Sequence, residues 1–214
     1  MAQIFPKWVN QVPRKLLIGV IILVNLIIFG VWHFFSPNYI DVGYAPVQPV
    51  PYSHKTHVGK LGLDCQYCHT GVFDSKQANI PATQTCMNCH GQVKRDSDKL
   101  ALVRESWETG EAIEWVRVHN LADYAYFNHS AHVNVGVGCE SCHGRVDRME
   151  VVYQAEPLSM GWCLDCHRAP EEHLRPVEEV TTMGYKAENQ LELGKELVSK
   201  NNVHPPTYCQ GCHY

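Results

Sequence analysis

The sequence has no surplus of positive charge, and it has no cysteine outside one repeated motif. Its 18 lysines and arginines face 22 aspartates and glutamates, which gives a formal net charge of −4. Proteins that bind nucleic acid usually carry a basic surplus, so this balance argues against a nucleic-acid partner. By contrast, 10 cysteines and 13 histidines are many for 214 residues. Their spacing is therefore the main signal in the chain.

All the cysteines fall into Cys-x-x-Cys-His units. Numbered motifs 1 to 5 along the chain, these are Cys65/Cys68/His69, Cys86/Cys89/His90, Cys139/Cys142/His143, Cys163/Cys166/His167 and Cys209/Cys212/His213. In c-type cytochromes the two thiols bond to the vinyl groups of one haem, and the adjacent histidine is the proximal iron ligand. A zinc site needs four ligands, so five motifs cannot all combine in pairs, and a thioredoxin-like redox motif would occur once. We predict five covalently attached haem c groups.

An apolar run at residues 16–35 is long enough to span a bilayer as a helix. Three basic residues precede it, whereas the first charge after it is Asp41, so the positive-inside rule predicts a cytoplasmic N-terminus. The rival interpretation is a cleaved signal peptide. However, the run is longer than a typical signal core, and the nearest cleavage-like triplet is followed by Pro46. We predict a single-pass anchor in the cytoplasmic (inner) membrane, with the haem-binding part on the periplasmic or extracytoplasmic side.

Two polar residues, Asn25 and His33, lie within or near the end of this run. Both could contact a quinone. We favour a helix–helix hydrogen bond for Asn25 and exposure at the membrane interface for His33.

An internal repeat organises the rest of the chain. Tyr-Ser-His-Lys-Thr-His at 52–57 and Phe-Asn-His-Ser-Ala-His at 127–132 each precede two haem motifs. We therefore divide the chain into an N-terminal stub and anchor (1–35), a proline-rich linker (36–51), a first dihaem module (52–90), a connector (91–126), a second dihaem module (127–167) and a C-terminal segment with motif 5 (168–214).

Regular secondary structure is predicted to be sparse. Residues 96–110 and 186–200 have helical patterns, and residues 112–121 partly alternate like a strand. We expect the fold of a multihaem cytochrome c, mostly irregular with a few short helices wrapped around five haems, after a single N-terminal transmembrane helix. Porphyrin faces would then supply much of the apolar core.

Five further iron ligands are expected, because a haem that only carries electrons usually has both axial positions filled. Two His-x-x-His pairs supply four candidates: His54, His57, His129 and His132. Histidines at i and i+3 project from the same side of a turn but cannot bind opposite faces of one iron, so each pair should serve two haems. For the fifth position we select His119, which lies in an apolar segment. The alternatives are Met160, His173 and His204.

The string at 127–132 resembles one that precedes a haem motif in the small tetrahaem cytochromes c3, and the string at 52–57 is nearly the same. In that family the first histidine binds the haem of the next motif, and the second binds another haem. The resemblance implies that His129 binds the haem of motif 3 and His54 that of motif 1. His57 and His132 would bind other haems.

Over nearly its whole length the chain is similar to the pentahaem cytochrome subunit of alternative complex III. The similarity rests on the anchor, the five motifs, and the strings VHNLADYAYFNHSAHV and MGWCLDCHR. That complex oxidises menaquinol or ubiquinol and passes electrons to a periplasmic acceptor. The resemblance implies an electron-transfer subunit without catalytic residues of its own. Its partners would be an iron–sulfur subunit resembling molybdopterin oxidoreductases, polytopic quinol-binding subunits and a monohaem cytochrome.

Two other functions stay as alternatives. A multihaem reductase would need an open haem position, which is often marked by a lysine in the motif, whereas all five motifs here end in histidine. A stand-alone quinol dehydrogenase would share the anchor and the motifs but hold the quinol site on its own chain. Low-spin spectra from every haem would favour an electron conductor over a reductase. Quinol oxidation by the isolated chain would favour the stand-alone dehydrogenase.

Overall fold

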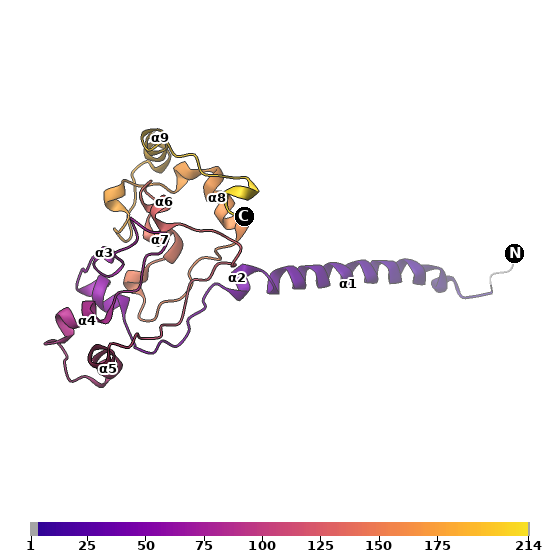
Figure 1. Ribbon diagram of the computed structural model, residues 1–214. Helices are drawn as coiled ribbons and strands as arrows, with labels where there is room; N and C mark the ends of the chain where they lie inside the picture. Colours follow the sequence, from indigo (N-terminus) through magenta and orange to yellow (C-terminus); the bar gives the residue numbers. More distant parts are fainter. Residues whose placement is uncertain (1–3, 214) are drawn as a thin grey trace. The chain divides into compact units, whose positions relative to one another are not determined.

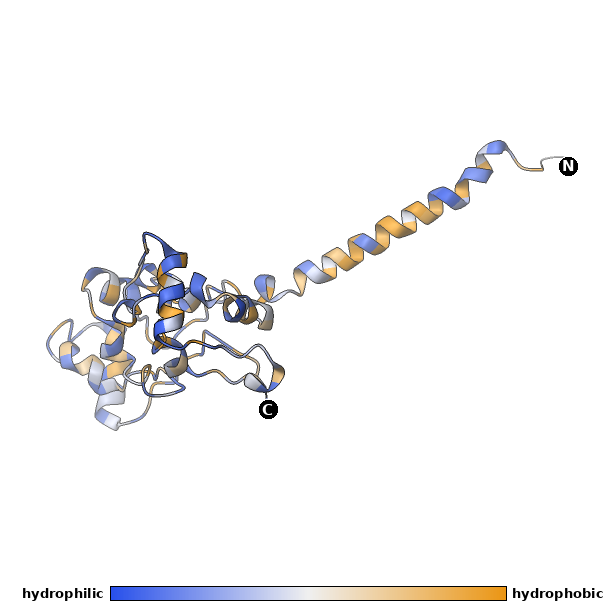
Figure 2. Ribbon diagram, turned by 90° about the horizontal axis from the view of Figure 1, so that it is seen from above, coloured by the Kyte–Doolittle hydropathy of each residue, from blue (hydrophilic) through white to orange (hydrophobic). Residues whose placement is uncertain are grey.

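The computed structural model describes residues 4–213, which divide into an N-terminal unit ending at Ile40 and a second unit beginning at Asp41 (Figure 1). The first unit consists of a short turn, Lys7–Gln11, followed by helix α1, Val12–Phe34, and helix α2, Pro37–Ile40. At about 1.5 Å per residue α1 is roughly 34 Å long, enough for a hydrocarbon core of about 30 Å. Most of its surface is apolar (Figure 2). Length and composition therefore fit a membrane anchor or a signal sequence, as the apolar run predicted.

The polar residues of this helix find partners within their own unit. The side-chain amide of Asn25 donates a hydrogen bond to the carbonyl oxygen of Ile21, one turn earlier, at 2.8 Å. The ring of His33 lies parallel to that of Phe29, with centroids 5.9 Å apart. The bond to Ile21 satisfies one of the two N–H groups of the Asn25 amide within its own helix.

The second unit is an irregular chain that carries short helices, as expected. Its α-helices are α3 (Cys65–Cys68), α4 (Thr83–His90), α5 (Ala101–Thr109), α6 (His129–Val133), α7 (Cys139–His143), α8 (Met160–Arg168) and α9 (Gln190–Lys200). Single turns occur at Lys55–Lys60 (η2), Asp98–Leu100 (η3), Val146–Arg148 (η4), Pro170–Glu172 (η5), Val177–Glu179 (η6) and Cys209–Gly211 (η7). Residues 4–213 contain no strand beyond an isolated antiparallel bridge between Val137 and Leu174.

Both helices expected from the sequence are present, each starting a few residues late. Helix α5 ends at Gly110, whose φ of 78° is the left-handed conformation that glycine adopts most easily. Helix α9 begins after Asn189, whose side chain accepts a hydrogen bond from the backbone N–H of Glu192. Helix ends are therefore readable here from cap and stop residues.

The predicted strand at 112–121 was wrong. The side chain of Gln48 takes the place of a neighbouring strand. Its amide donates to the carbonyl oxygen of Val116 at 2.8 Å, and its oxygen accepts from the N–H of Val116 at 3.0 Å. The alternation of side chains predicted a strand. The segment is instead irregular, because no second strand pairs with it.

Each haem motif lies on a helical turn. Motifs 1, 3 and 5 begin α3, α7 and η7, motif 2 ends α4, and motif 4 lies within α8. Cysteines at i and i+3 of one turn share a face, which suits two bonds to one flat group. Caps fix two of these turns: the side chain of Asp64 accepts from the N–H of Gln66 before α3, and Ser159 accepts from Trp162 in α8.

The apolar core of the described chain is small. Its main cluster joins Leu174 to Leu197 of α9 and to Val203. Helix α9 approaches η5 so closely that a Cβ at Gly194 would overlap the carbonyl group of Glu171. Nine hydrophobic side chains are buried in residues 4–213, few for a chain of this length, so folding needs another source of apolar contact.

Candidate haem sites

Four of the five motif histidines each face a second histidine. The pairs, with their centroid separations and interplanar angles, are His54/His69 (6.5 Å, 1°), His57/His90 (6.2 Å, 68°), His129/His143 (6.3 Å, 7°) and His132/His167 (6.1 Å, 38°). A metal–imidazole bond is roughly 2 Å long, so rings on opposite faces of one iron have centroids about 6 Å apart. The separations fit an iron held between each pair.

Hydrogen bonds orient the motif histidines. The Nδ1–H groups donate to backbone carbonyl oxygens in four cases: His69 to Asn79 (2.7 Å), His90 to Val93 (2.9 Å), His167 to Pro206 (2.7 Å) and His213 to Tyr124 (2.9 Å). A proton on Nδ1 leaves the lone pair of Nε2 free for a metal. The backbone thus selects the tautomer that iron ligation requires.

The two His-x-x-His segments repeat the same local geometry. His57 donates from Nδ1 to the carbonyl oxygen of Ser53 at 2.8 Å, and His132 donates to that of Asn128 at 2.7 Å, each four residues back. In both repeats the preceding aromatic ring packs against the two histidines, Tyr52 in the first and Phe127 in the second. The sequence repeat is therefore a structural repeat.

The first histidines of the two repeats differ in their Nδ1 contacts. His129 donates to the carbonyl oxygen of Lys76, in the other module, at 2.9 Å. The Nδ1 of His54 is buried and has no hydrogen-bond partner among the described residues. The His129 bond therefore ties the second repeat to the first module.

Burial keeps these imidazoles neutral. It lowers the pKa of His54 to about 4, with smaller contributions from His69 and His57. Burial, followed by the neighbouring histidines, lowers the pKa of His143 to about 3. It also lowers the pKa of His132. Only a neutral imidazole has the lone pair that binds a metal, so the surroundings suit ligation.

Neighbouring motifs lie side by side in a defined order. The side-chain amide of Asn88, within motif 2, donates to the hydroxyl of Tyr67, within motif 1, at 3.1 Å, which places motif 1 beside motif 2. Residues 180 and 181 bring motif 1 beside motif 3: the Cys65 thiol donates to the carbonyl oxygen of Thr181 at 4.0 Å, and the backbone N–H of Cys139 donates to that of Val180 at 2.9 Å.

The order continues through the second module. Burial raises the pKa of Cys142 to about 12, with the Cys166 and Cys163 thiols contributing, so motif 3 meets motif 4. Burial, and then the Cys212 thiol, raise the pKa of Cys163, which places motif 4 beside motif 5. The motifs therefore form one row in the order 2–1–3–4–5. In Figure 1, α7 lies between α4 and the C-terminal end of the chain.

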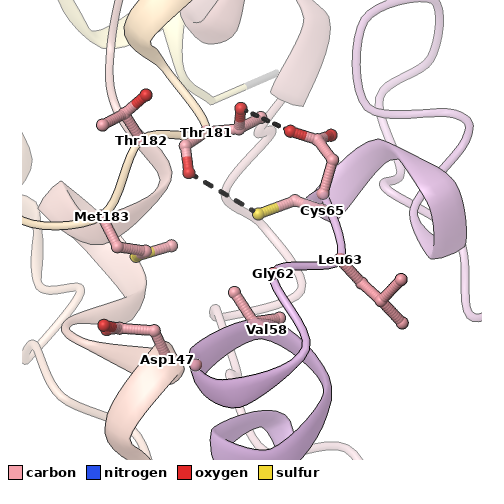
Figure 3. Close-up of a pocket in the computed structure, with 10 residues that line it drawn as sticks. Val58, Gly62, Leu63, Cys65, Asp147, Thr181, Thr182 and Met183 are labelled. Carbon is pink, nitrogen blue, oxygen red and sulfur yellow. Dashed lines mark hydrogen bonds between the residues drawn. The ribbon is translucent and has the colours of Figure 1, made fainter.

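A cavity of about 270 Å³ opens beside Cys65 of motif 1 (Figure 3). Val58, Leu63 and Met183 give it apolar walls, and Asp147 and Thr182 add polar ones. The Cys65 sulfur points toward the carbonyl oxygen of Thr181, 4.0 Å away, and the hydroxyl of Thr181 donates to the carboxylate of Asp64 at 2.8 Å. Open space at an attachment cysteine, together with the small apolar core, fits a large apolar group bound here.

His119 lies differently from the other four candidate distal ligands. Its Nε2, the atom that would bind iron, is 3.2 Å from the Nδ1 of His143, and the two rings meet edge to face at 4.3 Å. This geometry gives no support to the prediction that His119 is a distal ligand.

His213 of motif 5 is the motif histidine for which no histidine is found opposite among residues 4–213; the ring of Tyr124 packs beside it, with centroids 5.7 Å apart. Of the alternative fifth ligands, Met160 is 68% exposed. The exposed His204 has its Nε2 3.1 Å from the side-chain oxygen of Asn202.

A family model described as cytochrome c7 and related cytochrome c matches residues 50–106 and 125–214, which include every motif and both His-x-x-His pairs. The chain belongs to this family. It is therefore a multihaem cytochrome with covalently bound haem c, as the motifs predicted. The unmatched stretch between the two segments contains His119.

This multihaem cytochrome is also similar to a protein that is named as the subunit of an enzyme complex. It is 29% identical over 175 aligned positions to the menaquinone reductase, multihaem cytochrome c subunit, of Nitratidesulfovibrio vulgaris strain Hildenborough. The alignment covers 71% of this chain and 80% of the relative. The similarity favours an electron-transfer subunit over a catalytic one.

The angles between paired imidazole planes predict the electron paramagnetic resonance spectrum of the oxidised protein. Parallel planes split the iron d orbitals strongly and give rhombic low-spin signals, whereas nearly perpendicular planes give signals with a large maximum g value. We expect rhombic signals from the His54/His69 and His129/His143 sites and a large-g signal from the His57/His90 site. A spectrum without any large-g component would contradict the pairing of His57 with His90.

Proposed function

We propose that the protein is a membrane-anchored pentahaem cytochrome that conducts electrons from a quinol-oxidising membrane complex, of the alternative complex III type, toward a periplasmic acceptor. Each covalently bound haem supplies one-electron exchange between Fe(II) and Fe(III). The chain's residues would hold these groups by ten cysteines, ligate them through paired histidines, and shield the ligand rings partly from water. No step needs an acid, a base or a nucleophile.

The row of motifs in the order 2–1–3–4–5 is the observation that carries this proposal. The consecutive residues Val180 and Thr181, which accept hydrogen bonds from Cys139 and Cys65, bring the two dihaem modules together at motifs 1 and 3. The end motifs contain the two exposed cysteines, Cys89 and Cys209, whereas the other eight cysteines are half-buried. A conductor needs this arrangement: a continuous interior and two ends open to partners.

The anchor and the relative support the membrane setting. Helix α1 would hold the chain in the cytoplasmic membrane, with its N-terminus inside and the five motifs on the periplasmic side. The relative is a subunit of a menaquinone reductase, which supports a membrane quinone oxidoreductase as the partner complex. The resemblance to alternative complex III implies the particular partners that we propose: an iron–sulfur subunit, polytopic quinol-binding subunits and a monohaem cytochrome. The domain limits given above, with modules at 52–90 and 127–167, form part of this proposal.

Removing the attachment cysteines of motif 3 tests both electron conduction and the order of the haem motifs. In the assembled complex we expect Cys139→Ala with Cys142→Ala to leave four haems, of which quinol rapidly reduces only the two on one side of the gap. The matched control removes an end of the row, Cys209→Ala with Cys212→Ala, and should leave the remaining four connected. Stopped-flow absorbance after quinol addition measures the reduced fraction.

Two results would overturn the proposal. Rapid reduction of all four haems in the central variant would contradict the row. Rapid quinol oxidation by the purified native chain alone would show a stand-alone quinol dehydrogenase instead of a conducting subunit.

A further inference from the structure

The segment that carries His119 is held by two glutamine side chains. Gln48 pairs with both backbone groups of Val116, three residues before His119. The side-chain oxygen of Gln154, which is buried, accepts from the N–H of Asn120, the next residue, at 3.4 Å. The backbone of Gln154 is itself paired with Gly43 and Tyr44. His119 is therefore fixed from both sides, although it lies in no helix or strand.

The fixed ring meets His143, the motif histidine at the centre of the row. The Nδ1 of His143 is 3.2 Å from the Nε2 of His119. His143 needs its Nε2 lone pair for iron, so its Nδ1 carries the proton and donates, and His119 accepts.

This contact distinguishes motif 3 from the other motifs. The remaining four motif histidines donate from Nδ1 to backbone carbonyl oxygens. Among the described residues, His143 is the motif histidine whose Nδ1 meets a side chain. An imidazole nitrogen is a more basic acceptor than a peptide oxygen, and partners of this kind raise the basicity of a ligating histidine.

We propose that His119 is a positioning residue for the central haem: it accepts the Nδ1–H hydrogen bond of His143, orients that imidazole, and increases its electron donation to the iron. Greater donation stabilises Fe(III), so His119 lowers the midpoint potential of this one haem. His119 is then not a distal ligand, because its Nε2 is occupied by the N–H of His143. The inference rests on the proposed function only in that motif 3 holds a haem.

The variants His119→Phe and His119→Asn separate hydrogen bonding from packing. Phenylalanine retains an edge-to-face ring against His143 but has no acceptor, whereas asparagine retains a side-chain acceptor. In the purified full chain we expect His119→Phe to raise one midpoint potential. The expected size is about a tenfold change in the oxidised-to-reduced ratio at fixed potential, ~59 mV for one electron. His119→Asn should restore part of the shift. Redox titration followed by optical spectra measures both.

Each outcome decides the question. Native haem content, no gain in cyanide binding and one raised potential in His119→Phe support the positioning role. A new high-spin haem that binds cyanide would show that His119 is an axial ligand, and unchanged potentials would reduce the contact to packing. The conduction proposal is tested by a different measurement, the reduction of the haems by quinol in the assembled complex. The positioning role of His119 can therefore fail while the conduction proposal holds.

Discussion

Replacing His132 by alanine is expected to produce one more cyanide-binding haem than the native protein has, without releasing any haem. His132 faces His167 at 6.1 Å, and its ring is fixed by the bond from its Nδ1 to the carbonyl oxygen of Asn128. Alanine cannot ligate iron, so one axial position would open. Cys163 and Cys166 would still hold the group covalently, because thioether bonds do not depend on the axial ligand.

The absorption spectrum measures this change. A high-spin band should appear in His132→Ala and should disappear on titration with cyanide, at one equivalent above the native protein. His57→Ala should behave in the same way, since His57 holds the corresponding position in the first repeat and faces His90. His204→Ala is the matched control, because that exposed ring contacts Asn202. A low-spin spectrum indistinguishable from that of the native protein, in both His132→Ala and His57→Ala, would contradict the pairing.

The sequence predicted the attachment chemistry but left part of the ligand pairing open. Haem attachment needs two cysteines and a histidine within a single helical turn. Because these residues are adjacent in the chain, their spacing can be read directly from the sequence. The partners of His57 and His132 depend instead on where irregular segments lead. In each repeat the second histidine faces the second motif of the same module, which no spacing rule indicated.

The order of the motifs was also beyond the sequence. It depends on the segment at 180–181, which binds both Cys65 and Cys139, residues that are far apart along the chain. The apolar setting of His119 agrees with its half-buried ring, but partial burial alone does not say which ring is the neighbour. The predicted strand at 112–121 failed for a related reason: the side chain of Gln48, not a second strand, satisfies its backbone.

The intact mass of the denatured protein, after extraction with acidified acetone, tests most directly whether all ten cysteines bind haem. The five motifs each lie on a helical turn, and in four of them the histidine faces a second histidine across a gap that fits an iron. We therefore predict that the red colour stays with the polypeptide and that its mass exceeds that of the bare chain by five haem groups. Loss of the colour to the acetone, or a mass equal to that of the bare chain, would contradict this.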